Sequence, residues 1–99
     1  MTTFKLIKTP NQKFSTNINN HLFEFIFRTF RGITYITVSV DGELQEGSVR
    51  AVPNLSLFNS VVNTLAGGEF KFVCTTDDYP HYTMFNGVDA VFTFTPYGE

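Results

Sequence analysis

The side chains best suited to catalysis are one cysteine and two histidines, Cys74, His21 and His81. A cysteine nucleophile needs a basic neighbour or a helix N-terminus that favours the thiolate, and neither stands near Cys74 in the sequence. Cys74 instead alternates with Phe70 and Phe72, and cysteine is among the residue types most often buried. We therefore predict that Cys74 packs in the core.

Patterns for binding metals or phosphate are equally weak. The two histidines lie far apart and neither has the spacing of a zinc ligand pair. Asp77 and Asp78 lack the alternating Asp/Asn ligands of a calcium loop. Gly67 and Gly68 follow a predicted helix instead of opening one, and no Lys-Ser/Thr comes after them, which indicates a helix end. We predict no catalytic residue, no metal and no cofactor.

Composition bounds the class of protein. A length of 99 residues predicts a single domain. The net charge of −2 and the absence of a Lys/Arg cluster argue against a nucleic-acid surface.

No apolar run approaches the ~20 residues of a membrane helix, and we see no signal peptide. The single cysteine excludes an internal disulfide and indicates cytosolic synthesis. Charged residues are only 16% of the chain, which is typical of a protein that packs against other subunits.

Phenylalanine supplies the strongest structural signal, with twelve residues and no tryptophan in the chain. Alternation with period two places side chains on one face of a β-strand. The alternating sets are Phe23, Phe25 and Phe27, then Phe70 and Phe72, then Phe92 and Phe94. They predict a mainly β domain with a Phe-rich core.

Turn signals divide the chain into strands. Strands over 21–30 and 33–40 are joined at Arg31-Gly32, and Asp41-Gly42 leads into a strand over 43–51 with a bulge at Gly47. Further strands are predicted over 69–75 and 90–95. Residues 1–20 contain two weaker extended stretches, 3–7 and 13–19, which form either core strands or an arm.

Between these strands the hydrophobic period changes to that of a helix. Asn54 is a suitable N-cap and Gly67 a suitable stop. The predicted buried face consists of Leu55, Phe58, Val61, Val62 and Leu65. The fold class expected is a small antiparallel β-sandwich or barrel of about six to seven strands with one short helix, at about residues 54–66.

Two groups of apolar residues raise the question of an interface. The first is the loop that contains Tyr79, Tyr82, Met84 and Phe85, because aromatic residues concentrate binding energy at interfaces. The alternative is that this loop folds back and plugs one end of the barrel. The second group is in the N-terminal residues and consists of Phe4, Leu6, Phe14 and Ile18. It belongs either to core strands or to a segment that pairs with the edge of a neighbouring subunit. A different class of function, binding of an apolar ligand in a Phe-lined interior, is also open.

Several short motifs carry a family resemblance. They are Val52-Pro53-Asn54-Leu55, then Leu65-x-Gly67-Gly68-Glu69-Phe70, then Tyr79-Pro80-x-Tyr82-Thr83-x-Phe85-Asn86, followed by an alternating apolar end. In this order they resemble the small baseplate plug proteins of contractile-tailed phages, the cyanophage-type plug domain. The match covers about residues 21–95, which form the plug-like core of the single domain 1–99.

The resemblance implies a non-enzymatic virion component in the tail baseplate, present in the host cytoplasm during assembly. It implies partners among hub and spike proteins and copies of the chain arranged with closed symmetry about the tail axis. The candidate contact residues are Phe4, Leu6, Tyr79, Tyr82, Met84 and Phe85.

Overall fold

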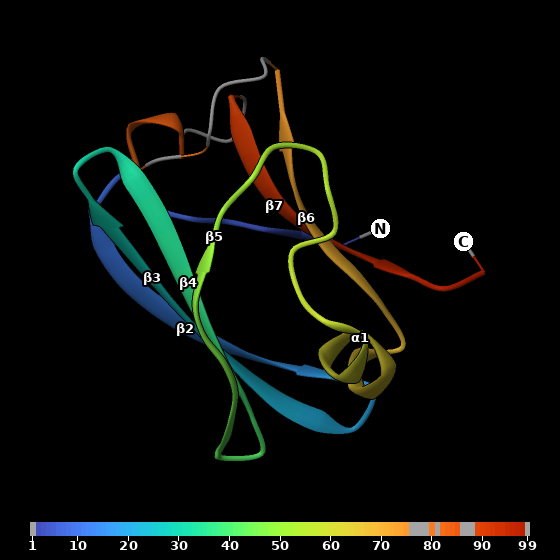
Figure 1. Ribbon diagram of the computed structural model, residues 1–99. Coiled ribbons are helices and arrows are strands. Elements are labelled where there is room, and N and C mark those ends of the chain that lie inside the picture. The colour runs from blue at the N-terminus through green and yellow to red at the C-terminus, as the bar shows by residue number, and fades with distance from the viewer. Residues whose placement is uncertain (1, 76–79, 81, 86–88, 99) are drawn as a thin grey trace.

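Two antiparallel sheets pack face to face in the computed structural model, which describes residues 2–75, 80, 82–85 and 89–98 (Figure 1). One sheet has the order β1 (Thr2–Phe4), β7 (Ala90–Pro96), β6 (Gly68–Cys74). The other has the order β2 (Asn11–Ile18), β3 (His21–Phe30), β4 (Ile33–Val40), β5 (Glu43–Arg50). A helix, α1 (Ser60–Ala66), and a 3-10 turn, η1 (Tyr82–Met84), complete the described elements. The predicted mainly β fold is confirmed, as a sandwich and not a closed barrel.

Three two-residue turns set the register of the four-stranded sheet. In each turn both central residues have positive φ, as a type I′ hairpin turn requires. The central residues are Asn19 and Asn20, Arg31 and Gly32, and Asp41 and Gly42. The predicted turns at Arg31-Gly32 and Asp41-Gly42 are confirmed. The predicted bulge is confirmed as well, because the β4–β5 register shifts near Gly47.

The core is a layer of phenylalanine rings between the sheets. Phe25 on β3, Phe70 on β6 and Phe92 on β7 are fully buried, and their ring centroids lie 5.2–5.8 Å apart. The β1 residue Phe4 reaches the same layer, 5.5 Å from Phe92. The predicted Phe-rich core is therefore confirmed, and the rings at its centre contact one another directly.

The helix is shorter than predicted. It begins at Ser60, with Asn59 as N-cap accepting a hydrogen bond from the Val62 amide, and it ends at Gly67 in the left-handed conformation. The prediction that it starts at Asn54 is wrong, because residues 53–57 run along the edge of β6. The Asn54 and Leu57 amides donate to the carbonyls of Phe72 and Phe70.

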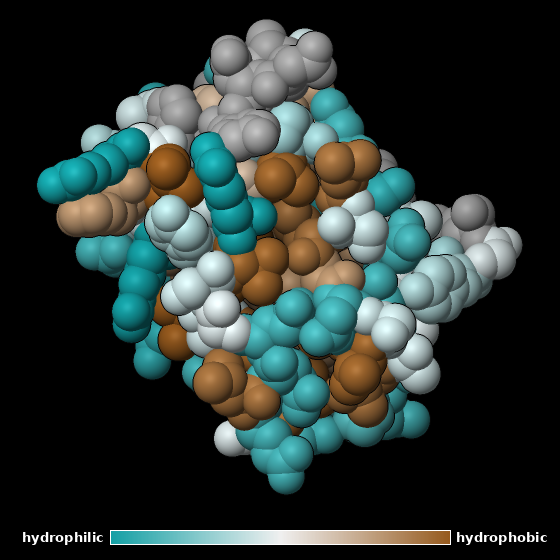
Figure 2. All heavy atoms as spheres, in the orientation of Figure 1, coloured by the Kyte–Doolittle hydropathy of each residue, from teal (hydrophilic) through white to brown (hydrophobic). Residues whose placement is uncertain are grey.

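The predicted buried face of this helix is also wrong in part. Val61 and Leu55 are 55% and 62% exposed, whereas Val62 and Ala66 are buried. The physical reason is that the residues before Ser60 are not helical, so the helical spacing that joined Leu55 to Val61 does not apply. Figure 2 shows apolar side chains reaching the surface in this part of the molecule, bordered by polar ones.

Candidate interaction site

An apolar hollow of about 280 Å³ lies at the rim of the three-stranded sheet. Two segments that are far apart in the sequence meet at this hollow, because β1 near the N-terminus pairs with β7 near the C-terminus. Its walls come from the start of the chain, from the turn at η1 and from the start of β7. They are Thr3, Phe4, Lys5, Leu6, Phe85, Ala90 and Val91.

The hollow exists because the β1–β7 ladder stops early. Pairing ends at Phe4↔Phe92, whereas on its other side β7 stays paired with β6 as far as Cys74↔Ala90. The chain therefore leaves the sheet after Phe4, and Ala90 and Val91 have no partner on β1. A gap at the end of a ladder combines apolar side chains with peptide groups that can accept an added strand.

The structure brings together three of the six predicted contact residues. Phe4, Leu6 and Phe85 all line the hollow. Leu6 and Phe85 are 8% and 3% exposed, so most of their surface already packs against the core, while Phe4 is half-buried.

The other predicted contact residues lie outside the lining. Tyr82 and Met84 are half-buried in η1 and rest against the core. Tyr79 lies outside the described residues. The described part of this loop therefore has two roles. Phe85 helps to close this end of the sandwich, where its ring stacks on Phe72 with centroids 5.6 Å apart. Phe85 also forms part of the wall of the hollow.

Ala90, Val91, Thr3 and Lys5 line the hollow and were not predicted. In the sequence, Ala90 and Val91 look like ordinary residues of a predicted strand. Thr3 and Lys5 look like the polar positions of a weakly predicted strand. No sequence signal marks the point where a ladder ends, because that point depends on a partner strand about ninety positions away.

Cys74 lies at the end of β6 and is half-buried. Burial raises the pKa of its thiol, so the protonated form dominates at neutral pH. Its amide donates to Asn54 Oδ1 at 3.0 Å, which clamps the connecting segment to β6. The prediction that Cys74 packs is consistent with this placement, and the chemistry of the site disfavours a nucleophile.

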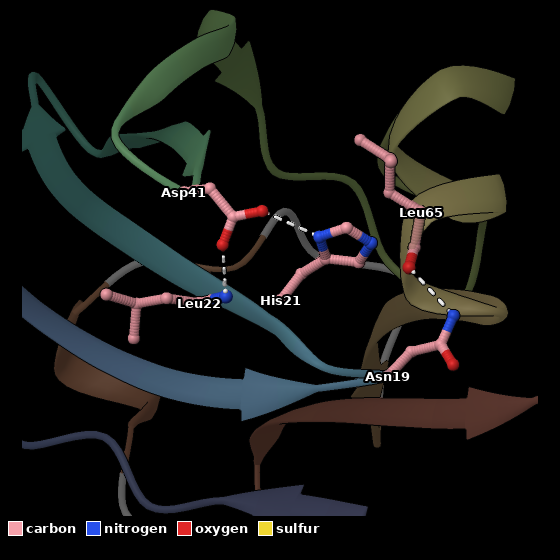
Figure 3. Close-up of polar contacts among 5 residues, drawn as sticks. All are labelled: Asn19, His21, Leu22, Asp41 and Leu65. Carbon is pink, nitrogen blue, oxygen red and sulfur yellow. Dashed lines mark hydrogen bonds and ion pairs between the residues drawn. The ribbon is translucent and has the colours of Figure 1, made fainter.

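His21 forms a polar latch with the β4–β5 turn (Figure 3). Its Nδ1 lies 2.6 Å from Asp41 Oδ2, and Asp41 Oδ1 accepts the Leu22 amide at 2.9 Å. The hydrogen bond from His21, and then that from Leu22, lower the pKa of Asp41. In the same view Asn19 Nδ2 donates to the Leu65 carbonyl at 3.1 Å and ties the β2–β3 turn to α1. These contacts join a turn to a strand or to the helix, which is a structural role.

Other classes of site find no support in the described residues. Within 2–75, 80, 82–85 and 89–98 no group of three His, Cys, Asp or Glu residues is placed to hold a metal ion. No helix in the same ranges is long and apolar enough to cross a membrane. His81, Asp77 and Asp78 lie outside the described residues.

A comparison with known protein families shows the family of the chain. The family model described as "Cyanophage baseplate Pam3 plug gp18" matches residues 1–96 of the chain. The match includes the first twenty residues, so the expectation that the family pattern covers only about 21–95 is wrong. The structure agrees with the longer span, because β1 and β2 are strands of the two sheets. No curated protein sequence matches the chain.

Proposed function

Because the chain belongs to the cyanophage baseplate plug family, we propose that it is a non-catalytic structural subunit that packs against hub and spike proteins. It associates with copies of itself and is present in the host cytoplasm before assembly into the virion tail. The family match across residues 1–96 is the observation that carries this proposal.

The apolar hollow supports a docking role. An apolar cavity of about 150 Å³ holds a benzene molecule, so a hollow of about 280 Å³ has room for one aromatic or large aliphatic side chain. The edge of β7 beside it offers peptide groups to an extended segment of the partner. We propose that a hub or spike protein inserts an apolar side chain here, beside Phe4, Leu6 and Phe85.

The state of the candidate catalytic groups supports a non-enzymatic role. The Cys74 thiol has a raised pKa. A nucleophile needs the opposite, a lowered pKa and an adjacent base.

The test is co-expression with the hub and spike proteins of the same phage, followed by size-exclusion chromatography and native mass spectrometry. We expect the wild-type chain to co-elute with at least one of them. Val91→Glu places a charge at the rim of the hollow and should abolish co-elution.

Val73→Glu is the matched control. Val73 pairs with Val91 across β6 and β7, is 44% exposed and does not line the hollow. We expect this variant to co-elute like the wild type. The proposal fails if the wild-type chain binds no baseplate protein, and the assignment to the hollow fails if both variants bind equally.

A further inference from the structure

The edges of the two sheets are protected unequally. The outer edge of β6 is covered by residues 53–57, whose amides donate to its carbonyls. Strand β5 contains two register shifts, and Glu46 Oε2 accepts the Asn59 amide beside it. Strand β2, by contrast, pairs with β3 in unbroken register over eight residues and has no strand on its other side among the described elements. Long, regular edges of this kind are templates for pairing with another chain.

The β2 edge carries positive charge. Strand β2 contains an exposed lysine, Lys13, and no acidic residue. Lys13 forms no ion pair within the described part of the chain. A shallow groove of about 500 Å³ runs over the outer face of β2 and β3, with Lys13 and Arg28 in its wall.

The opposite end of the same sheet carries negative charge. The β4–β5 hairpin presents Asp41, Glu43 and Glu46, and Leu44 between them is 66% exposed. Before the first bulge this hairpin is regular, with Glu43 opposite Val40 and Leu44 opposite Ser39. An acidic hairpin with an exposed leucine complements a basic groove that Ile26 also lines.

Strand direction decides how two copies can meet. Four successive antiparallel strands make β2 and β5 run in opposite directions. Suppose that a rotation about an axis parallel to the strands relates one copy to the next. Each strand then keeps its direction in the next copy, so β5 of one copy meets β2 of the next in antiparallel orientation. Pairing like edges would join two edges of the same charge, the β2 edges with Lys13 or the β5 edges with Glu43, which is unfavourable.

We infer that the acidic start of β5 in one copy docks on the basic β2 edge and groove of a second copy. This contact joins two different surfaces of the chain and, if repeated around an axis, forms a ring. The inference relies on the proposed function only for the arrangement of copies around an axis. The contact itself is argued from the unpaired edge of β2, the opposite charges of the two surfaces and the opposite directions of β2 and β5.

Light scattering coupled to size-exclusion chromatography at low salt tests the contact on the full chain. We expect the wild-type mass to be at least twice the monomer mass of 11.2 kDa and to fall toward the monomer at high salt. Lys13→Glu and Glu43→Lys should each abolish the assembly. The double variant should restore it, because every contact then pairs the exchanged charges.

Two further variants separate strand pairing from general effects. Ser15 lies in the middle of β2 between residues that face the core, and Ser15→Pro removes an edge N–H while leaving the β2–β3 side intact. It should abolish assembly with an unchanged circular dichroism spectrum. Lys71→Glu, the same charge change in the other sheet, should have no effect.

A wild-type chain that remains a monomer overturns the inference. So does an assembly that survives Ser15→Pro, or one that Lys13→Glu and Lys71→Glu weaken equally. A monomer that still co-elutes with a hub or spike protein overturns this inference and the proposed self-association, and leaves the proposed docking on baseplate proteins standing.

Discussion

Replacing Phe92 with alanine tests whether the ring layer carries the stability of the sandwich. Phe92 is fully buried on β7, and its ring contacts residues of both sheets. These ring partners are Phe4, Phe14, Phe25, Phe27, Phe70 and Phe72, at 5.2–6.2 Å between centroids.

The expected loss follows from this environment. Transfer of a buried Phe side chain to water costs about 1.5–3 kcal/mol. The cavity that remains adds to this, because partners held by two sheets cannot collapse into it, so we expect a total of about 4–5 kcal/mol. A chain of this length has a free energy of unfolding of roughly 5–15 kcal/mol, so the variant loses about a quarter or more of its stability.

Urea unfolding followed by circular dichroism measures the effect. With an m value of about 2 kcal/mol/M, a loss of 4 kcal/mol lowers the midpoint by about 2 M. If Phe92→Ala does not fold, Phe92→Leu should still lose about 1–2 kcal/mol.

Phe30→Ala is the matched control, since Phe30 is 66% exposed and its ring lies 5.2 Å from the Arg31 guanidinium. Its loss should stay within about 1 kcal/mol. Equal losses at the two positions, or a loss below about 1 kcal/mol for Phe92→Ala, would refute the account of the core.

Two further predictions concern a close backbone approach and a titrating latch. Gly68→Ala should lose about 1–3 kcal/mol or more in the same assay, because its Cβ would lie next to the Thr95 carbonyl oxygen and two Phe94 ring carbons. Gly47→Ala, with no atom within 4 Å of its Cβ, should be neutral or slightly stabilised, and equal losses would contradict the steric argument. For the latch, the lowered pKa of Asp41 in the folded state means that its stabilisation is present above the unfolded pKa of about 3.9 and is lost as pH falls through the folded value. Asp41→Asn, which tolerates the positive φ of this turn, should therefore flatten the acid side of the stability–pH curve; an unchanged curve would show that the latch is not formed.

Local patterns in the sequence were sufficient for strands and turns. Side chains alternate across a strand whatever its neighbours are, so Phe23, Phe25 and Phe27 had to share a face. The two-residue turns at Arg31-Gly32 and Asp41-Gly42 likewise depend on local backbone preferences. The strands over 21–30 and 33–40 were predicted with the bounds that the structure has.

The partners of these strands were decided only by the tertiary structure. A period of two identifies a face but not the strand that lies beside it, so neither the division into two sheets nor the β1–β7 pairing followed from the pattern. Residues 53–57 have a helical hydrophobic spacing but do not form a helix, because their amides donate hydrogen bonds to the edge of β6. These bonds replace those of a first helical turn. The hollow formed by Phe4, Leu6 and Phe85 has the same origin, because it lies where a ladder between the two ends of the chain stops.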